Sequence, residues 1–355
     1  MRADPLTLVQ VMPPGDGGVR DYVDGLQAEW QRGGTPSTVI ELSKALARTQ
    51  PLVEQIEALM ARRGHASSRL SVVLHYSGYG YGHRGLCFWL LDQIRHLRTR
   101  HRDALRLVVV FHELYASGPP WRSAFWLTSI QAGLAARLAT TADALWTNSA
   151  LHAQWLRTKV AAGTPLQVRP VFSNIGEPDH LPAWTTRRPE AVVFGSASTR
   201  QRAFDALRGH DAVLQGLGID TLVEVGSGTT AGSATRLKRR QVGRLDTAAL
   251  GQLLLTSQLG VLDYPSALLG KSGVLAAYAA HGCAVLNTRP AGADTDSLIA
   301  GRDYLTLQQG RLASDAPACS MPGDRLAALA TRLSSWYAGH PLAGQAHDLL
   351  TMCRA

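Results

Sequence analysis

The sequence predicts an α/β protein with two Rossmann-like domains, and three observations carry this prediction. The chain has 355 residues, which is long for a single hydrophobic core. Hydrophobic residues make up 45% of it and charged residues only 18%, a composition that permits packed cores. Short runs of Val, Leu and Ile alternate with longer helical patterns, which is typical of βαβ units and parallel sheets.

The first half of the chain contains six predicted strands with helices between them. The strands are expected at Leu6–Met12, Ser37–Glu41, Leu70–Tyr76, Leu105–Phe111, Ala144–Asn148 and Leu166–Phe172. The clearest helical patterns are Val19–Gln31, Leu86–Leu97 and Ser123–Leu138. We expect residues 1–178 to form the first domain.

A proline-rich stretch then interrupts the pattern, and we place a linker at residues 179–190. The alternation restarts in residues 191–335, the expected second domain. Its strands are predicted at Ala191–Phe194, Thr221–Val225, Leu259–Leu262 and Ala284–Leu286. Helices are predicted at Arg200–Gly216, Ala248–Ser257, Ser272–Ala280, Asp324–Tyr337 and Leu342–Cys353. We expect the C-terminal residues 336–355 to be helical and to pack back on the first domain.

The charge of the chain narrows the classes of partner. A net charge of +9, shared by both halves, favours anionic partners such as nucleotide phosphates or acidic lipid. No nucleic-acid-binding motif accompanies this charge, so we do not expect nucleic acid as a partner.

Cysteine usage and hydropathy suggest the compartment. Cys87, Cys283, Cys319 and Cys353 are scattered singly, which argues against a zinc site or a disulfide framework and is typical of a reducing cytoplasm. The chain begins without a secretory signal pattern and contains no apolar run of about 18 residues. We therefore expect a cytoplasmic protein without a metal ion, attached at most to the inner face of a membrane.

Ligands of Rossmann-like domains bind outside the carboxyl ends of the strands, so the residues that follow each strand matter most. Gly17 and Gly18 follow the first strand, where glycines and helix amides favour an anion; a plain tight turn is the alternative. His112 and Glu113 follow the strand Leu105–Phe111 directly. A single histidine is more often structural, but this position beside the predicted cleft favours a role in the reaction.

The third strand leads into a loop in which glycines alternate with aromatic residues. Tyr79, Tyr81 and Arg84 lie in this loop, whose flat, hydroxyl-bearing rings suit sugars. The alternative interpretation is a glycine-rich surface loop.

Two strand ends of the second half carry cations. Gly195 and Ser196 precede Arg200 and Arg202 at the start of a helix, where two arginines can hold a diphosphate; solvated surface arginines are the alternative. Further along, Lys271, Ser272 and Gly273 open another helix. A lysine with helix N-terminal amides predicts an anion site, and a capping role is the alternative.

These segments, in this order, resemble the retaining GT-B glycosyltransferases of the group 1 type, over most of the chain. The resemblance rests on Gly17-Gly18, His112-Glu113, the segment 142–149, Gly195-Ser196 with Arg202, and the segment 265–285. It implies the GT-B fold, in which two Rossmann-like domains face each other across a cleft. It also implies transfer of a sugar from a nucleotide-diphosphate sugar, with retention, to a glycan or lipid-linked glycan, with the nucleotide sugar as co-substrate and no cofactor or metal.

The resemblance assigns roles to the residues above. His112, Arg202 and Lys271 would be catalytic. The donor would contact Gly17, Gly18, Gly195, Ser196, Arg200, Ser272 and Gly273, and the acceptor would contact Tyr79, Tyr81 and Arg84. The family commonly has two glutamates in an E-x7-E arrangement, and this chain has Leu269 and Ala277 at those positions. A non-catalytic protein that binds a nucleotide sugar or supports a partner enzyme is therefore the alternative function.

Five arginines crowd one predicted helix and its exit: Arg95, Arg98, Arg100, Arg102 and Arg106. They predict a patch that docks on anionic lipid, at about 1 kcal/mol per cation near the surface. A solvated helix face is the alternative.

Overall fold

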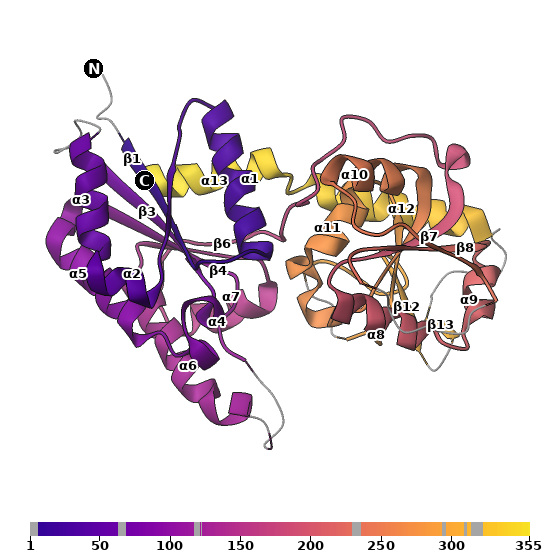
Figure 1. The fold of residues 1–355 in the computed structure, drawn as a ribbon, viewed down its shortest axis with the longest axis horizontal. Coiled ribbons are helices and arrows are strands. Elements are labelled where there is room, and N and C mark those ends of the chain that lie inside the picture. Colours follow the sequence, from indigo (N-terminus) through magenta and orange to yellow (C-terminus); the bar gives the residue numbers. More distant parts are fainter. Residues whose placement is uncertain are drawn as a thin grey trace. The chain divides into compact units, whose positions relative to one another are not determined.

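The computed structural model describes residues 6–62, 69–116, 121, 123–228, 236–292, 296–308, 311–313 and 322–355. The chain divides into two compact units. Unit 1 contains residues 1–169 and 342–355, and unit 2 contains residues 170–341. In Figure 1, unit 1 is coloured from indigo to magenta and also holds the last yellow helix.

Unit 1 is built on a parallel sheet of six strands in the order β2-β1-β3-β4-β5-β6. Its strands are β1 (Leu6–Met12), β2 (Thr38–Glu41), β3 (Arg69–Tyr76), β4 (Leu105–Phe111), β5 (Ala144–Thr147) and β6 (Leu166–Val168). The central strands are almost wholly buried, as in a parallel sheet covered on both faces. Their register pairs Tyr76 with Phe111, and Phe111 with Thr147, so the carboxyl ends of β3, β4 and β5 lie side by side.

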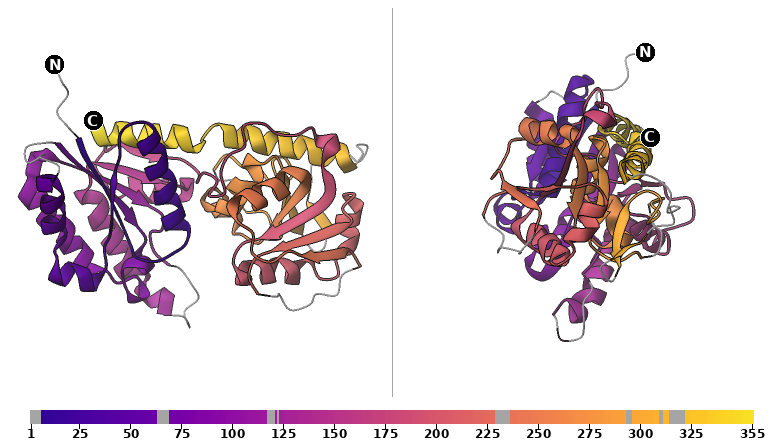
Figure 2. Two further views of the ribbon diagram at one scale, coloured as in Figure 1. Left: turned by 45° about the horizontal axis from the view of Figure 1, so that its top comes forward. Right: turned by 90° about the vertical axis from the view of Figure 1, so that its right-hand side faces the viewer.

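Helices cover both faces of this sheet (Figure 2). The helices of unit 1 are α1 (Gly18–Arg32), α2 (Lys44–Thr49), α3 (Leu52–Arg62), α4 (Gly78–Tyr81), α5 (Phe88–His101), α6 (Ser123–Thr141), α7 (Ala150–Arg157) and α13 (Leu342–Arg354), with short 3-10 turns at His83–Gly85 and Arg102–Ala104. Helix α13 packs on α1 and on strands β3 and β4. Trp30 Nε1 donates to Ala346 O at 2.8 Å and Ser71 Oγ donates to Cys353 O at 2.6 Å, which anchors the last helix in unit 1.

Unit 2 is built on a sheet of seven strands in the order β13-β12-β11-β10-β7-β8-β9, with only the β12–β13 pair antiparallel. The strands are β7 (Arg188–Phe194), β8 (Thr221–Val225), β9 (Lys238–Gln241), β10 (Ser257–Leu262), β11 (Ala284–Asn287), β12 (Leu305–Gln308) and β13 (Arg311–Ala313). The helices are α8 (Ala197–Leu207), α9 (Asp211–Gly216), α10 (Thr247–Thr256), α11 (Gly273–Ala280) and α12 (Pro322–Ala338), with 3-10 turns at Trp184–Thr186 and Ser266–Lys271.

One close contact fixes α11 on the sheet of unit 2. The ring of Tyr278 lies directly over Gly260 of β10, where a Cβ atom would overlap it, so only glycine fits at this position. The Tyr278 hydroxyl reaches Val192 O at 2.7 Å and Val261 O at 3.1 Å. Burial without charge compensation raises the pKa of Tyr278 well above its usual range, so the phenol stays protonated and donates.

The predicted α/β fold class is confirmed, and most predicted strands agree with the structure to within a few residues. The predicted boundary at residue 178 is wrong, because unit 1 ends at Arg169. Pro170 has no amide hydrogen to continue β6, and Val171 N already donates to Gly270 O of unit 2 at 2.7 Å. The expected C-terminal helix 336–355 is two helices, α12 in unit 2 and α13 in unit 1.

Within the described ranges, no helix is long and apolar enough to cross a membrane. Cys87, Cys283 and Cys353 are buried free thiols. Cys319 lies outside the described residues.

Candidate functional site

His112 lies at the carboxyl end of β4 and closes a chain of hydrogen bonds through the sheet of unit 1. Its ring nitrogen Nε2 lies 3.1 Å from Nδ1 of His75 on β3. His75 Nε2 lies 3.1 Å from Oε1 of Gln10 on β1, and Gln10 Nε2 donates to Ser37 Oγ at 2.9 Å. All four side chains are buried, so the chain is a structural feature of the interior rather than a surface contact.

The direction of these bonds follows from the protonation of His75. Burial, with a smaller contribution from His112, lowers the pKa of His75 well below its usual range, so His75 is neutral at pH 7. Gln10 presents its carbonyl oxygen, an acceptor, so His75 carries its proton on Nε2 and accepts at Nδ1. His112 therefore donates its Nε2 hydrogen to His75, which makes Nδ1 the acceptor nitrogen of His112.

Two helices hold the His112 ring in place. The ring of Tyr22 on α1 meets it edge to face, with centroids 5.1 Å apart, and also lies 6.0 Å from the His75 ring. The Tyr22 hydroxyl donates to Gln345 Oε1 of α13 at 3.3 Å. Such edge-to-face aromatic pairs restrict ring rotation, so the orientation of His112 is set before any ligand arrives.

The predicted acceptor-side residues separate into two groups. Tyr81 is 4% exposed and packs in the core, with its hydroxyl on Val11 O at 3.3 Å, so the prediction that it contacts the acceptor is wrong. Tyr79 is half-exposed and Arg84 is exposed. Gln131 Nε2 of α6 joins them by donating to Arg84 O at 2.7 Å and to the Tyr79 hydroxyl at 3.4 Å.

Gly17 and Gly18 lie where α1 begins, on the exposed surface of unit 1. Gly17 precedes the helix with φ of 129°, a conformation that favours glycine, and no side chain caps the first amides. Helix amides of this kind can bind an anion, and the anion site at Gly17 and Gly18 stays a prediction.

The start of α8 in unit 2 is an exposed row of hydroxyls after β7. Gly195 has φ of 123°, and Ser196 caps the helix by accepting from Thr199 N at 3.3 Å. Ser196 and Ser198 are exposed. Hydroxyls and amides at such a strand-to-helix turn are suited to phosphate oxygens.

The prediction that Arg200 contacts the donor is wrong, because this side chain is 1% exposed. Its Nε donates to Glu224 Oε1 at 3.1 Å, and its terminal nitrogens donate to the carbonyls of Gly195 at 2.7 Å, Ser227 at 2.6 Å and Gly228 at 3.1 Å. Arg200 therefore holds the β7 and β8 loops together from inside unit 2.

Arg202 faces the other way and shares a buried carboxylate with Arg289. Arg202 Nε donates to Asp263 Oδ1 at 2.7 Å, and Arg289 Nε donates to the same oxygen at 3.2 Å. Asp263 is 5% exposed, whereas the arginine side chains are 48% and 47% exposed. The arrangement, which we call the arginine pair (Arg202 and Arg289), holds two guanidinium groups together at the carboxyl edge of the sheet.

The loops that carry the arginine pair are braced against each other. Asn287 at the end of β11 accepts from Tyr264 N at 3.1 Å and donates to Tyr264 O at 2.9 Å. Ser266 Oγ donates to Pro290 O at 2.7 Å. Because these bonds connect the loops after β10 and β11, Asp263 and Arg289 keep fixed relative positions.

The segment around Lys271 is partly explained by capping. Ser272 is 4% exposed and accepts from Leu275 N at 3.2 Å, so the capping alternative holds for its side chain. Lys271 is partly exposed at the end of the preceding 3-10 turn, and Gly273 begins α11.

Leu269 and Ala277 are buried at 1% and 0% exposure, so no carboxylate faces solvent from either position. The carboxylate of Asp296 contacts the 3-10 turn that contains Leu269: Asp296 Oδ2 accepts from Gly270 N at 3.0 Å.

The predicted basic patch on α5 does not form as one surface. Arg98 donates to Leu105 O, Thr141 O and Asp143, and Arg106 donates to Met352 O at 3.0 Å, so both are structural. Arg100 pairs with Glu57 at 2.7 Å and Arg95 lies 3.8 Å from Asp92. Arg98 and Arg106 therefore do not belong to the predicted lipid-binding patch. Arg95, Arg100 and Arg102 are exposed, and contact of these three with lipid stays a prediction.

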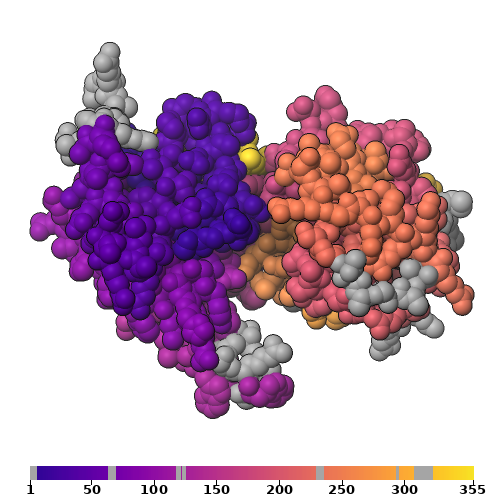
Figure 3. All heavy atoms as spheres, viewed as in Figure 1, coloured from indigo at the N-terminus to yellow at the C-terminus, as the bar shows by residue number. Residues whose placement is uncertain are grey.

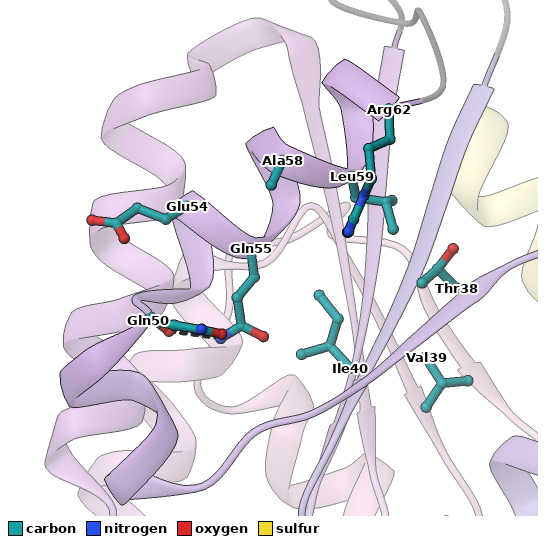
Figure 4. A pocket seen from close by; sticks show the side chains of 9 residues that line it. All are labelled: Thr38, Val39, Ile40, Gln50, Glu54, Gln55, Ala58, Leu59 and Arg62. Carbon is teal, nitrogen blue, oxygen red and sulfur yellow. Dashed lines mark hydrogen bonds between the residues drawn. The ribbon is translucent and has the colours of Figure 1, made fainter.

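A hollow of about 520 Å³ opens on unit 1 between edge strand β2 and helix α3 (Figure 4). Its lining residues are Thr38, Val39, Ile40, Gln50, Glu54, Gln55, Ala58, Leu59 and Arg62. None of these residues belongs to the predicted site.

Sequence reasoning missed His75, Gln10, Asp263 and Arg289. The signal for His75 and Gln10 was a polar residue inside an otherwise apolar strand. The signal for Asp263 and Arg289 was their position within two residues of the end of a strand.

No family model and no curated protein sequence matches the chain. Solved structures do. A UDP-forming α,α-trehalose-phosphate synthase from Burkholderia xenovorans aligns with a TM-score of 0.57 at 12% identity, over 99% of this chain and 99% of that one. A trehalose-6-phosphate synthase aligns with 0.57 at 12%, over 98% and 99%. An α-glucosyltransferase in complex with UDP and a 13-mer DNA containing an HMU base aligns with 0.57 at 8%, over 99% and 100%. The chain has the GT-B fold of these glycosyltransferases.

Proposed function

We propose that this protein is a metal-independent glycosyltransferase that moves a sugar from a nucleotide-diphosphate sugar to a glycan or lipid-linked glycan, with retention at the anomeric carbon. The observation that carries the proposal is the arginine pair at the carboxyl edge of unit 2, in a chain whose GT-B fold matches UDP-dependent transferases over nearly its whole length. In such sheets, ligands bind at this edge.

The chemical difficulty of the reaction is its leaving group. As the bond between C1 of the sugar and the phosphate oxygen breaks, the electron pair stays on the diphosphate, which gains negative charge. Arg202, Arg289 and Lys271 supply positive charge there, and the turn at Gly195 and Ser196 supplies amides and hydroxyls. The acceptor oxygen bonds to C1 on the same face, and its proton passes to the released diphosphate.

His112 has the chemistry to orient a sugar hydroxyl. Its Nε2 hydrogen is given to His75, so Nδ1 is an acceptor for a hydroxyl hydrogen. We place His112 against the transferring sugar or the acceptor, with Gly17 and Gly18 toward the donor and Tyr79 and Arg84 toward the acceptor. We expect the protein in the cytoplasm, peripheral to the inner membrane face, without nucleic acid as a partner.

A thermal-shift screen across nucleotide sugars tests donor binding. A ligand that binds only the folded state raises the free energy of unfolding by mass action, by about 2.7 kcal/mol at a ligand concentration of 100 times its Kd. The melting temperature rises accordingly. We expect at least one nucleotide sugar to raise the melting temperature and its sugar-free diphosphate to do likewise. No shift with any nucleotide would contradict the proposal.

Lys271→Ala is expected to weaken nucleoside-diphosphate binding by about 1.5–3 kcal/mol, the usual worth of a hydrogen bond to a charged group. Calorimetric titration of the folded variant measures it. The matched control is Lys238→Ala, which removes an exposed lysine on the edge strand β9. Equal affinity of the Lys271 variant and wild type would leave Lys271 with no role in donor binding.

Arg289→Ala is expected to weaken nucleoside-diphosphate binding about tenfold or more. We expect a smaller loss of nucleoside-monophosphate affinity, because the arginine pair would bind the second phosphate. Arg208→Ala is the control, since Arg208 is 58% exposed and pairs only with Asp205 within the described residues. Unchanged diphosphate affinity in the Arg289 variant would remove Arg289 from the site.

A second candidate function is a non-catalytic protein that binds a nucleotide sugar or supports a partner enzyme. The observation that favours it is the buried Leu269 and Ala277 in place of the two family glutamates. The two functions differ in one result: the non-catalytic protein binds the donor but releases no diphosphate from it.

A further inference from the structure

One face of helix α6 exposes large apolar side chains to solvent. Trp121 just before the helix is 83% exposed, and Phe125, Trp126 and Ile130 on its first turns are 45%, 70% and 41% exposed. We call these four residues the aromatic face. Trp126 and Ile130 are four residues apart and therefore lie on the same side of the helix. Gln131 and, one turn beyond Ile130, Leu134 are buried, so the exposed apolar side chains are confined to the first turns of α6. Exposed tryptophans concentrated in this way mark an interaction surface.

The helix that carries the aromatic face is fixed to the segment that follows His112 and Glu113. Gln131 Oε1 accepts from Ala116 N at 2.7 Å, and Thr128 Oγ1 donates to Ala116 O at 2.8 Å, so α6 is bound to the segment that follows His112 and Glu113. Gln131 also holds the turn at Arg84. Figures 1 and 2 show α6 reaching past the sheet of unit 1, and Figure 3 shows this region projecting from its surface.

The charges around this face suit an anionic surface. The sequence contains no aspartate or glutamate between Glu113 and Asp143, although it contains arginines there. His83 and Arg84, on the turn that Gln131 holds, are exposed. Tryptophan, with an apolar ring and a polar N–H, is the side chain that proteins concentrate at the boundary between headgroups and acyl chains.

We propose that the aromatic face inserts into the headgroup region of an anionic lipid bilayer, and that the acceptor is accordingly lipid-linked. The insertion places unit 1 so that an acceptor anchored in the bilayer is delivered to the strand edge that carries His112. The choice of acceptor rests on the proposed glycosyltransferase function, whereas the membrane contact does not. Binding of this kind grows with buried apolar area and with attraction to anionic lipid.

Co-sedimentation with vesicles tests the contact. Phosphatidylcholine vesicles with roughly one-third phosphatidylglycerol are compared with pure phosphatidylcholine, at low and high salt. We expect binding to the anionic vesicles that weakens with salt. The Phe125→Ser/Trp126→Ser double variant is expected to bind these vesicles about tenfold more weakly or worse. Leu151→Ser is the matched control, because Leu151 is 45% exposed on α7 of the same unit, and it is expected to bind as wild type does.

Three results would overturn the proposal: no binding of wild type to anionic vesicles, equal binding of the double variant and wild type, or an equal loss with Leu151→Ser. A fourth would be a wild-type dimer by light scattering that the double variant dissociates, because the aromatic face would then cover a second copy. Donor binding measured without vesicles separates this test from the proposed function, since failure of the membrane contact leaves nucleotide affinity unchanged.

Discussion

His112→Ala is expected to lower the turnover of the donor about 100-fold or more, the usual contribution of a well-placed hydrogen-bonding or acid–base group. The reason is that His112 is held between His75 and Tyr22 with its acceptor nitrogen fixed, at the strand edge where ligands of this fold bind. Steady-state release of nucleoside diphosphate measures the effect.

Removing the His112 ring also leaves Nδ1 of the buried His75 without the hydrogen bond that His112 donates to it. A second variant, His112→Gln, addresses this loss. Its amide N–H can donate to His75 and preserve the fold, and we expect it to lose turnover as well. Tyr22→Phe keeps the ring contact and is expected to retain turnover. Full activity in a folded His112→Gln protein would show that His112 is structural.

Arg200→Ala is expected to destabilise unit 2 by about 3–5 kcal/mol, the usual cost of removing one partner of a buried ion pair. The substitution removes the Arg200 partner of Glu224, which is 2% exposed and also accepts from Arg239 and Gln241. It also removes the donors to the carbonyls of Gly195, Ser227 and Gly228. Denaturant unfolding followed by circular dichroism measures it.

The exposed Arg208→Ala serves again as control, with an expected change within about 0.5 kcal/mol. An Arg200→Ala protein as stable as wild type, with weakened nucleotide binding, would mean that Arg200 contacts the donor as the sequence predicts and would contradict the structural role.

The sequence predicted the strands well wherever burial on both faces produces a continuous apolar run, as in β1 and β4. It missed β9, because Lys238-Arg239-Arg240-Gln241 contains no apolar residue. This strand forms because its backbone pairs with β8 and because Arg239 reaches the buried Glu224. Such a strand depends on a tertiary partner and carries no local signal.

The candidate site was predictable in its location but not in the direction of its side chains. Arg200 and Arg202 are two residues apart on α8, which turns them about 200° around the helix axis, so only one can face solvent. The rotation of α8 about its axis relative to the sheet decides whether Arg200 or Arg202 faces solvent, and the sequence does not contain this information. Likewise, the role of His75 depends on the pairing of β3 with β1 and β4, which brings Gln10 and His112 to its two ring nitrogens.

The most direct test of sugar transfer is release of nucleoside diphosphate from a panel of nucleotide sugars by the purified protein, with EDTA present and with a lipid-linked or soluble glycan acceptor. Transfer without a metal predicts steady release with at least one donor, faster with acceptor than without, and undiminished by EDTA. Binding of a donor with no release under any of these conditions would contradict the enzyme and leave the non-catalytic nucleotide-sugar protein.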